Sequence, residues 1–220
     1  MDTQTLQLTC PTCLAVETKS YPKVVDGAKD SSLETDIYSG DFFNHTCSQC
    51  GAIHQVTIPF LYIHSKRNYG IYLHPHLNES METRQKIFLQ VNDQFQSNYP
   101  NYQLRLTASV QSLIEKLTIW KDDKNDGAIE IVKILAQGAT DLSSKKATAY
   151  YYHYRLSPHL MYIKENQQYS SPYPLALETF VLKKYLSHLS LKKGTFLIID
   201  SLWAWSHLNK EGDLNEHYKQ

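Results

Sequence analysis

Alternation of apolar and polar residues predicts strands near the start of the chain. Residues 6–9 and 53–58 alternate with the period of two that a half-buried strand requires. Residues 60–64 and 70–74 are largely apolar or aromatic, and they flank a polar stretch, residues 65–69, that suits a hairpin turn. This part of the chain is therefore predicted to form mainly short strands.

Helices are predicted where apolar residues recur every three or four positions or where capping residues occur. The expected helices begin at Ser31, near Ile87, near Ser109 and at Asp126, cover residues 179–189, and follow Asp200 or Ser201. The first has a capping box formed by Ser31 and Glu34 and ends at Gly40. The fourth is capped by Asp126 and runs to Leu135, with Gly138 just past its end.

Three further strands are expected in the second half of the chain. Residues 102–107 alternate, residues 147–156 are rich in tyrosine, and residues 196–199 form a short apolar run. Strands and helices therefore both contribute to the structure, and the pattern is typical of an α+β fold.

The composition is that of an ordinary globular protein. Of the 220 residues, 42% are hydrophobic and 20% are charged, which excludes an intrinsically disordered chain. No apolar stretch approaches the roughly 20 residues of a membrane helix, so no membrane association is expected. The first residues lack the basic and apolar regions of a signal peptide, which favours the reducing cytoplasm.

The charges balance over the whole chain, with 22 basic and 22 acidic residues. Residues 1–76 carry 5 basic and 7 acidic side chains, whereas residues 146–220 carry 9 and 6. The small positive excess therefore lies at the C-terminal end. Because binding to a phosphate backbone depends on concentrated Lys and Arg, nucleic-acid binding is not expected.

The clearest chemistry lies in the four cysteines, which form two Cys-x-x-Cys pairs. Cys10 and Cys13 make up the first pair, and Cys47 and Cys50 make up the second. Two intervening residues let both sulfur atoms of a pair point to one side of a tight turn, and two such turns supply four thiolates for a tetrahedral zinc site. The 33 residues between the pairs exceed the usual interval, so the helix at Ser31 is expected to be an insertion.

Two other uses of the cysteines stay open, a redox pair and inert packing. A redox motif lies where a strand meets the start of a helix, which lowers the thiol pKa. Residues 14–18 instead predict an extended segment, and a second redox pair has no evident role. The sequence therefore favours one zinc ion per chain. Because four cysteines leave no ligand position open for water, the zinc is expected to be structural rather than catalytic.

In these cysteine pairs and in later segments, the chain resembles the bacterial CpXC domain family. The resemblance covers about residues 6–135 and includes residues 62–64, 71–75, 113–116 and 129–133. It implies a zinc-ribbon-like pair of turns at the four cysteines and carries over no catalytic residue. Leu14 departs from the pattern, which usually has Gly there, and Ser48 stands where Pro is often found.

Two polar clusters are further candidate sites. His64, His74 and His76 could approach one another at the predicted hairpin, but no carboxylate that would orient them is evident, and ordinary surface or packing histidines are favoured. The second cluster consists of Asp122, Asp123, Asp126 and Glu130. It lacks the ligand pattern of a calcium loop and is interpreted as a solvated turn followed by a helix cap.

Tyrosines of the predicted strand 147–156 form a third candidate. Tyr150, Tyr152 and Tyr154 would share one face, with Tyr151 and His153 on the other, and either set could stack on nucleic-acid bases. Tyrosines on one strand face more commonly belong to the core, which is the favoured interpretation. The basic residues closest in sequence, Lys145, Lys146, Arg155 and Lys164, are too scattered to follow a phosphate backbone.

These observations predict an α+β protein with an N-terminal zinc ribbon that carries an inserted short helix, followed by a mixed helix and strand unit. The predicted domains are residues 1–140, the zinc-ribbon domain with its helical extension, and residues 141–220, which could pack on the first as one unit. The predicted function is a structural-zinc scaffold for a protein-binding or adaptor surface, with nucleic-acid binding as the alternative. No Gly-rich phosphate loop, nucleophile elbow or His-Glu-x-x-His helix occurs, so an enzyme is the third interpretation.

Overall fold

The computed structural model describes residues 2–138, 148–165, 167–185, 189 and 191–210. The chain divides into two compact units that interleave in sequence. Unit 1 comprises Met1–Ile114 and Lys192–Leu197, and unit 2 comprises Glu115–Leu191 and Ile198–Gln220. The predicted domain boundary at residue 140 lies outside the described residues and stays a prediction. The mixture of helices and strands agrees with the predicted α+β class.

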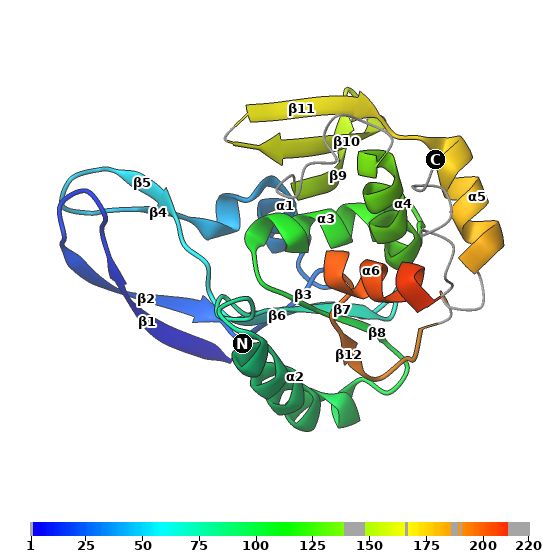
Figure 1. Cartoon of the computed structure of the whole chain (residues 1–220). Helices are drawn as coiled ribbons and strands as arrows, with labels where there is room; N and C mark the ends of the chain where they lie inside the picture. Colours follow the sequence, from blue (N-terminus) through cyan, green and yellow to red (C-terminus); the bar gives the residue numbers. More distant parts are fainter. Residues whose placement is uncertain (1, 139–147, 166, 186–188, 190, 211–220) are drawn as a thin grey trace. The chain divides into compact units, whose positions relative to one another are not determined.

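Unit 1 is built on a five-stranded mixed sheet (Figure 1). Its strands, in spatial order, are β12 (Phe196–Leu197), β8 (Gln103–Thr107), β7 (Tyr69–Leu73), β6 (Phe60–His64) and β3 (Val24–Asp26). Strands β6 and β7 are antiparallel, and the other neighbouring pairs are parallel. The predicted hairpin is confirmed, with Phe60 opposite Leu73 and His64 opposite Tyr69. Buried apolar side chains from all five strands make this sheet the core of unit 1, and they include Val25, Leu61, Ile71, Leu104 and Phe196.

Two smaller hairpins precede β6 in the sequence of unit 1. Strands β1 (Thr3–Thr9) and β2 (Val16–Pro22) form the first, and β4 (Asn44–Thr46) and β5 (Ile53–Gln55) form the second. Figure 1 shows both as antiparallel ribbons, in blue and cyan. The strand predicted over residues 53–58 is therefore too long, because pairing with the three residues of β4 ends at Gln55.

The helices of unit 1 are α1 (Ser31–Ser39), α2 (Met81–Phe95) and two short 3₁₀ turns, Asp41–Phe43 and Gln96–Asn98. Helix α1 lies between the two hairpins in sequence, as predicted, and ends at Gly40 in the left-handed conformation. The predicted cap at Ser31 is wrong. The carboxylate of Asp30 accepts the amide of Leu33 at 2.9 Å, so Asp30 takes the capping position one residue earlier.

Unit 2 surrounds helix α4 (Asp126–Gly138), which is buried without interruption from Asp126 to Ile134. Helices α5 (Leu175–Tyr185) and α6 (Ser201–Lys210) pack against α4. A three-stranded antiparallel sheet, in the order β11 (Gln167–Pro172), β10 (Ser157–Lys164) and β9 (Thr148–Tyr154), also contacts this helix through β9. Helix α3 (Val110–Lys121) crosses the division between the units. Strands β10 and β11 have no counterpart among the predicted elements.

The helix starts in unit 2 confirm one predicted cap and correct another. Asp200 caps α6, because its carboxylate accepts the amide of Trp203 at 3.0 Å. The predicted Asp126 cap is wrong, since the side chain of Asn125 accepts the amide of Ala128 at 3.0 Å, and Asp126 lies inside the helix. Gly138 is the last residue of α4 rather than the residue after it. Helix α5 begins at Leu175, four residues before its predicted start, and residues 186–188 of its predicted end lie outside the described residues.

Charged side chains are paired inside unit 2, where an unpaired charge would be strongly destabilising. The ammonium group of Lys133 lies 3.0 Å from Glu115 and 2.9 Å from Glu130. Lys116 lies 2.8 Å from Glu130, and the Glu115 carboxylate accepts the amide of Tyr151 at 2.7 Å. Burial by itself lowers the pKa of Lys133, but the two glutamates outweigh burial and raise it. Lys133 is therefore charged and links α3 to α4.

Candidate metal centre

The two Cys-x-x-Cys pairs form turns with the same backbone hydrogen bonds. In the first cysteine turn, residues 10–15, the Cys10 amide donates to Ala15 at 2.8 Å and the Leu14 amide donates to Cys10 at 2.9 Å. The second cysteine turn, residues 47–52, repeats this pattern with Cys47, Gly51 and Ala52, at 2.9 Å for both bonds. Each turn connects the strands of one hairpin, so each hairpin brings two sulfur atoms to one end.

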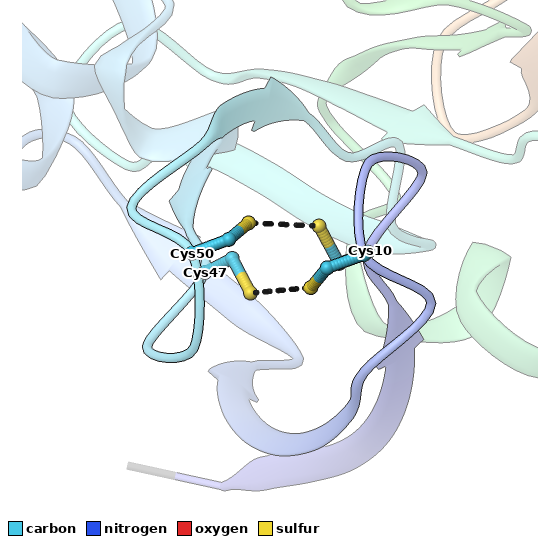
Figure 2. Close-up of side chains that lie close together, drawn as sticks. Cys10, Cys47 and Cys50 are labelled. Carbon is cyan, nitrogen blue, oxygen red and sulfur yellow. Dashed lines mark hydrogen bonds between the residues drawn. The ribbon is translucent and has the colours of Figure 1, made fainter.

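The four sulfur atoms meet between the cysteine turns, which face each other in Figure 2. Sγ of Cys10 lies 3.7 Å from Sγ of Cys50, Sγ of Cys13 lies 3.6 Å from Sγ of Cys47, and all four sulfur atoms lie within 4.8 Å of one another. Metal–sulfur bonds of about 2.3 Å in a tetrahedral zinc site place the sulfur atoms about 3.8 Å apart. The four cysteines therefore fit a metal ion.

Backbone amides lower the pKa values of both Cys10 and Cys13, whereas the neighbouring thiols lower the pKa of Cys10 and raise that of Cys13. The amides of Cys13 and Thr12 hydrogen-bond to the sulfur of Cys10 and lower its pKa to about 6. The Ala15 amide has the same effect on Cys13, but the neighbouring thiols, led by Cys50, and burial outweigh it and raise that pKa to about 12. Four thiols this close cannot all ionise unless a cation lies among them, so the site is suited to hold one.

A carboxylate from the first hairpin reaches the second cysteine turn. Glu17, on β2, accepts hydrogen bonds from the amide of Ser48 at 2.7 Å and from the Ser48 hydroxyl. Its other oxygen accepts a hydrogen bond from Nε2 of His45 at 2.9 Å. Glu17 also lies 3.9 Å from the sulfur of Cys47. The bonds from Ser48, followed by the one from His45, lower the pKa of Glu17 to about 2.

Comparison with known proteins shows the family of this chain. The sequence profile described as CpXC protein matches residues 8–133, more than half of the chain, and this range contains both cysteine turns. The chain belongs to the CpXC family. No curated protein and no solved structure matches it. Within the described residues of this CpXC protein, no helix is both long and apolar enough to cross a membrane.

The histidines in the described part of this CpXC protein do not join the cysteines or one another in a metal site. His64 ends β6 opposite Tyr69, whereas His74 follows β7 at the other end of the same ladder. His76 lies beside His74 and is hydrogen-bonded to Glu79 at 2.5 Å. Among the described residues, the four cysteines are the one group of three or more metal-ligating side chains close enough to hold an ion.

Three of the four acidic residues of the second cluster, Asp122, Asp126 and Glu130, divide between two different sets of partners. Asp122 accepts hydrogen bonds from Tyr151 and His153, on β9. Asp126 and Glu130 instead pair with the buried ammonium group of Lys116. The interpretation of this stretch as a solvated turn is therefore wrong for Asp126 and Glu130, because α4 is enclosed by the rest of unit 2.

The tyrosine strand has one buried and one more exposed face. Tyr151 is buried opposite Leu160, in agreement with a core role. Tyr150 and Tyr152 are only partly buried and Tyr154 is exposed, so the core interpretation is wrong for that face. Of the nearby basic residues, Lys145 and Lys146 lie outside the described residues.

The sequence patterns did not identify Glu17, His45 or Ser48 as contributors to this centre. Glu17 and Ser48 are 31 residues apart, and no periodicity relates them. The available signal was their position, because Glu17 follows Cys13 by four residues and Ser48 lies inside the second cysteine turn. A charged residue so close to a predicted metal ligand is a candidate for an outer hydrogen-bonding partner.

Proposed function

We propose that this protein binds one Zn²⁺ ion through Cys10, Cys13, Cys47 and Cys50, and that the ion is structural. The observation that carries the proposal is the pair of sulfur–sulfur distances, 3.7 and 3.6 Å, which are close to the edge of a tetrahedral zinc–thiolate centre. Thiolate ligands favour zinc over magnesium and calcium, which prefer oxygen. Four protein ligands fill the coordination shell and leave no position for a reacting water.

In this proposal the zinc ion joins the β1–β2 and β4–β5 hairpins into a zinc ribbon. The β4–β5 hairpin has only three residues in each strand, and β1 alternates between exposed and partly exposed positions without a buried residue. Small elements with so little core usually take much of their folding free energy from metal binding. A reducing compartment such as the cytoplasm would keep the thiols available for the ion.

We further propose that the zinc-stabilised hairpins form a scaffold for a protein partner. Three large apolar side chains next to the cysteines support this part, because Leu14 is 74%, Val16 is 62% and Ile53 is 69% exposed. Exposed apolar side chains that lie close together are typical of surfaces that bind other proteins. The acidic excess of residues 1–76 disfavours the nucleic-acid alternative.

Metal analysis of the purified protein tests the zinc proposal. We expect one zinc per chain after dialysis against metal-free buffer that contains a reductant. We also expect that Co²⁺ added to the zinc-free protein gives the absorption bands of tetrahedral cobalt–thiolate bonds. A protein that takes up neither ion under reducing conditions would overturn the proposal.

Filter binding with single-stranded and duplex nucleic acids at two salt concentrations distinguishes the two partner classes. We expect no appreciable retention at physiological salt. Micromolar binding that weakens steeply with salt would indicate counterion release. It would show that the partner is a nucleic acid rather than a protein.

A further inference from the structure

Glu17 connects the two halves of the candidate metal centre through hydrogen bonds. Its carboxylate belongs to β2, in the first hairpin. The three donors belong to the second hairpin, one from His45, before Cys47, and two from Ser48, after it. The side chains of Glu17 and His45 are largely buried, with 11% and 7% exposed. Charge-assisted hydrogen bonds shielded from water are stronger than exposed ones.

The two cysteine turns differ at the position that contacts Glu17. Pro11 follows Cys10 in the first turn, and Ser48 follows Cys47 in the second. Because the two turns share their backbone hydrogen bonds, the second position accepts a proline without loss of the turn. A proline has no amide N–H and no hydroxyl. Ser48 therefore supplies two donors to Glu17 that the turn itself does not require.

We infer that Glu17 is a positioning residue for the metal centre, because its hydrogen bonds to Ser48 and His45 hold the second cysteine turn against the first hairpin before an ion binds. This inference rests on the proposed zinc function. In the absence of such a link, the ion must bring together two hairpins whose cysteine pairs are separated by 33 residues. Residues that orient metal ligands from outside the coordination shell typically contribute 10–100-fold to metal affinity.

The test compares the zinc affinity of matched variants by competition with a chromophoric chelator under reducing conditions. Glu17→Gln keeps the size of the side chain but replaces one acceptor oxygen with a donor. Ser48→Pro copies the residue of the first turn and removes both donors. We expect each variant to retain one zinc per chain and to bind it about 10–100-fold more weakly than wild type.

Two control variants share the location but not the role. Pro11→Ser changes the equivalent position of the first turn, and Thr18→Ala changes the exposed neighbour of Glu17 on β2. We expect both to bind zinc with wild-type affinity. Hydrogen exchange on the zinc-free protein adds a readout that does not depend on the ion. The Ser48 amide should exchange faster in Glu17→Gln than in wild type, whereas the Tyr62 amide in the central sheet should not change.

The outcomes distinguish failure of the proposed zinc site from failure of the role inferred for Glu17. Wild-type protein that binds no zinc overturns the proposed function, and the inference is overturned with it. Zinc binding in wild type with equal affinity in Glu17→Gln and Ser48→Pro overturns the inference alone. An unchanged exchange rate at the Ser48 amide in zinc-free Glu17→Gln would also overturn it, because the bond would then not form ahead of the ion.

Discussion

Leu14 and Gly51 have the same left-handed backbone conformation at equivalent positions of the two cysteine turns, with φ of 60° and 73°. Each follows the second cysteine of its pair, and each donates its amide to the carbonyl of the first. Glycine adopts this conformation without steric cost, whereas the Cβ atom of leucine approaches the following carbonyl oxygen. The first turn therefore contains a strained residue where the second turn has an unstrained one.

Replacing Leu14 with glycine is expected to stabilise the protein. The change relieves the strain of a left-handed leucine, and little packing is lost because Leu14 is 74% exposed. We expect the free energy of unfolding of the zinc-bound protein to rise by about 0.5–1 kcal/mol, after the greater flexibility of glycine in the unfolded chain is counted. Urea denaturation measures this, with Gly51→Leu as the reciprocal variant that should lose stability. A destabilised Leu14→Gly would show that the leucine side chain has packing that outweighs the strain.

Substitution of one buried ligand is expected to affect the hairpins selectively. In Cys47→Ser we expect loss of tight zinc binding and fast hydrogen exchange in β1, β2, β4 and β5. Strands β6 and β7 should stay protected, because buried residues such as Leu61 and Ile71 belong to the core of unit 1. Thr12→Ser, inside the first cysteine turn, is the control that should keep its zinc. Exchange that is equally slow in all strands of Cys47→Ser would contradict a stabilising role for the ion.

Removal of a buried cation from unit 2 is expected to be strongly destabilising. Lys133→Met leaves the carboxylates of Glu115 and Glu130 without the ammonium group that lies about 3 Å from both. We expect a loss of about 3–5 kcal/mol in the free energy of unfolding, measured by chemical denaturation. Lys183→Met, on the exposed side of α5, should change stability by less than about 0.5 kcal/mol. A similar small effect at Lys133 would mean that Glu115 is protonated in the folded protein, because Glu130 also pairs with Lys116.

The short strand β12 is expected to depend on one side chain of α2. The amide oxygen of Asn92 accepts the backbone N–H of Phe196 at 2.7 Å, and its nitrogen donates to the carbonyl of the same residue at 3.2 Å. Asn92→Ala leaves both buried groups of Phe196 without these bonds, at about 1–3 kcal/mol for each. We expect faster hydrogen exchange at Phe196 and lower stability, whereas Gln90→Ala, on the exposed side of α2, should have little effect. Unchanged exchange at Phe196 would show that pairing with β8 is sufficient.

Structural features that depend only on residues close together along the chain could be predicted from the sequence. Two cysteines separated by two residues fix the geometry of a turn, and a period of two or of 3.6 identifies a strand or a helix, because these interactions act over only a few positions. The β6–β7 hairpin, α1 with its end at Gly40, and the cysteine set Cys10, Cys13, Cys47 and Cys50 belong to this class. Cap positions were missed by one residue at Asp30 and Asn125, because adjacent polar side chains compete for the same amides.

The tertiary structure decided which distant side chains meet. The Glu17–Ser48 hydrogen bond spans 31 residues, and the Asn92–Phe196 bond spans 104. Because the entropy of closing a loop changes only slowly with its length, the sequence alone leaves many such pairings nearly equal in free energy. Packing of the whole unit selects among them. The four cysteines of the candidate metal centre were therefore predictable from the spacing within each pair, whereas the carboxylate of Glu17 beside them became visible only once both hairpins were in place.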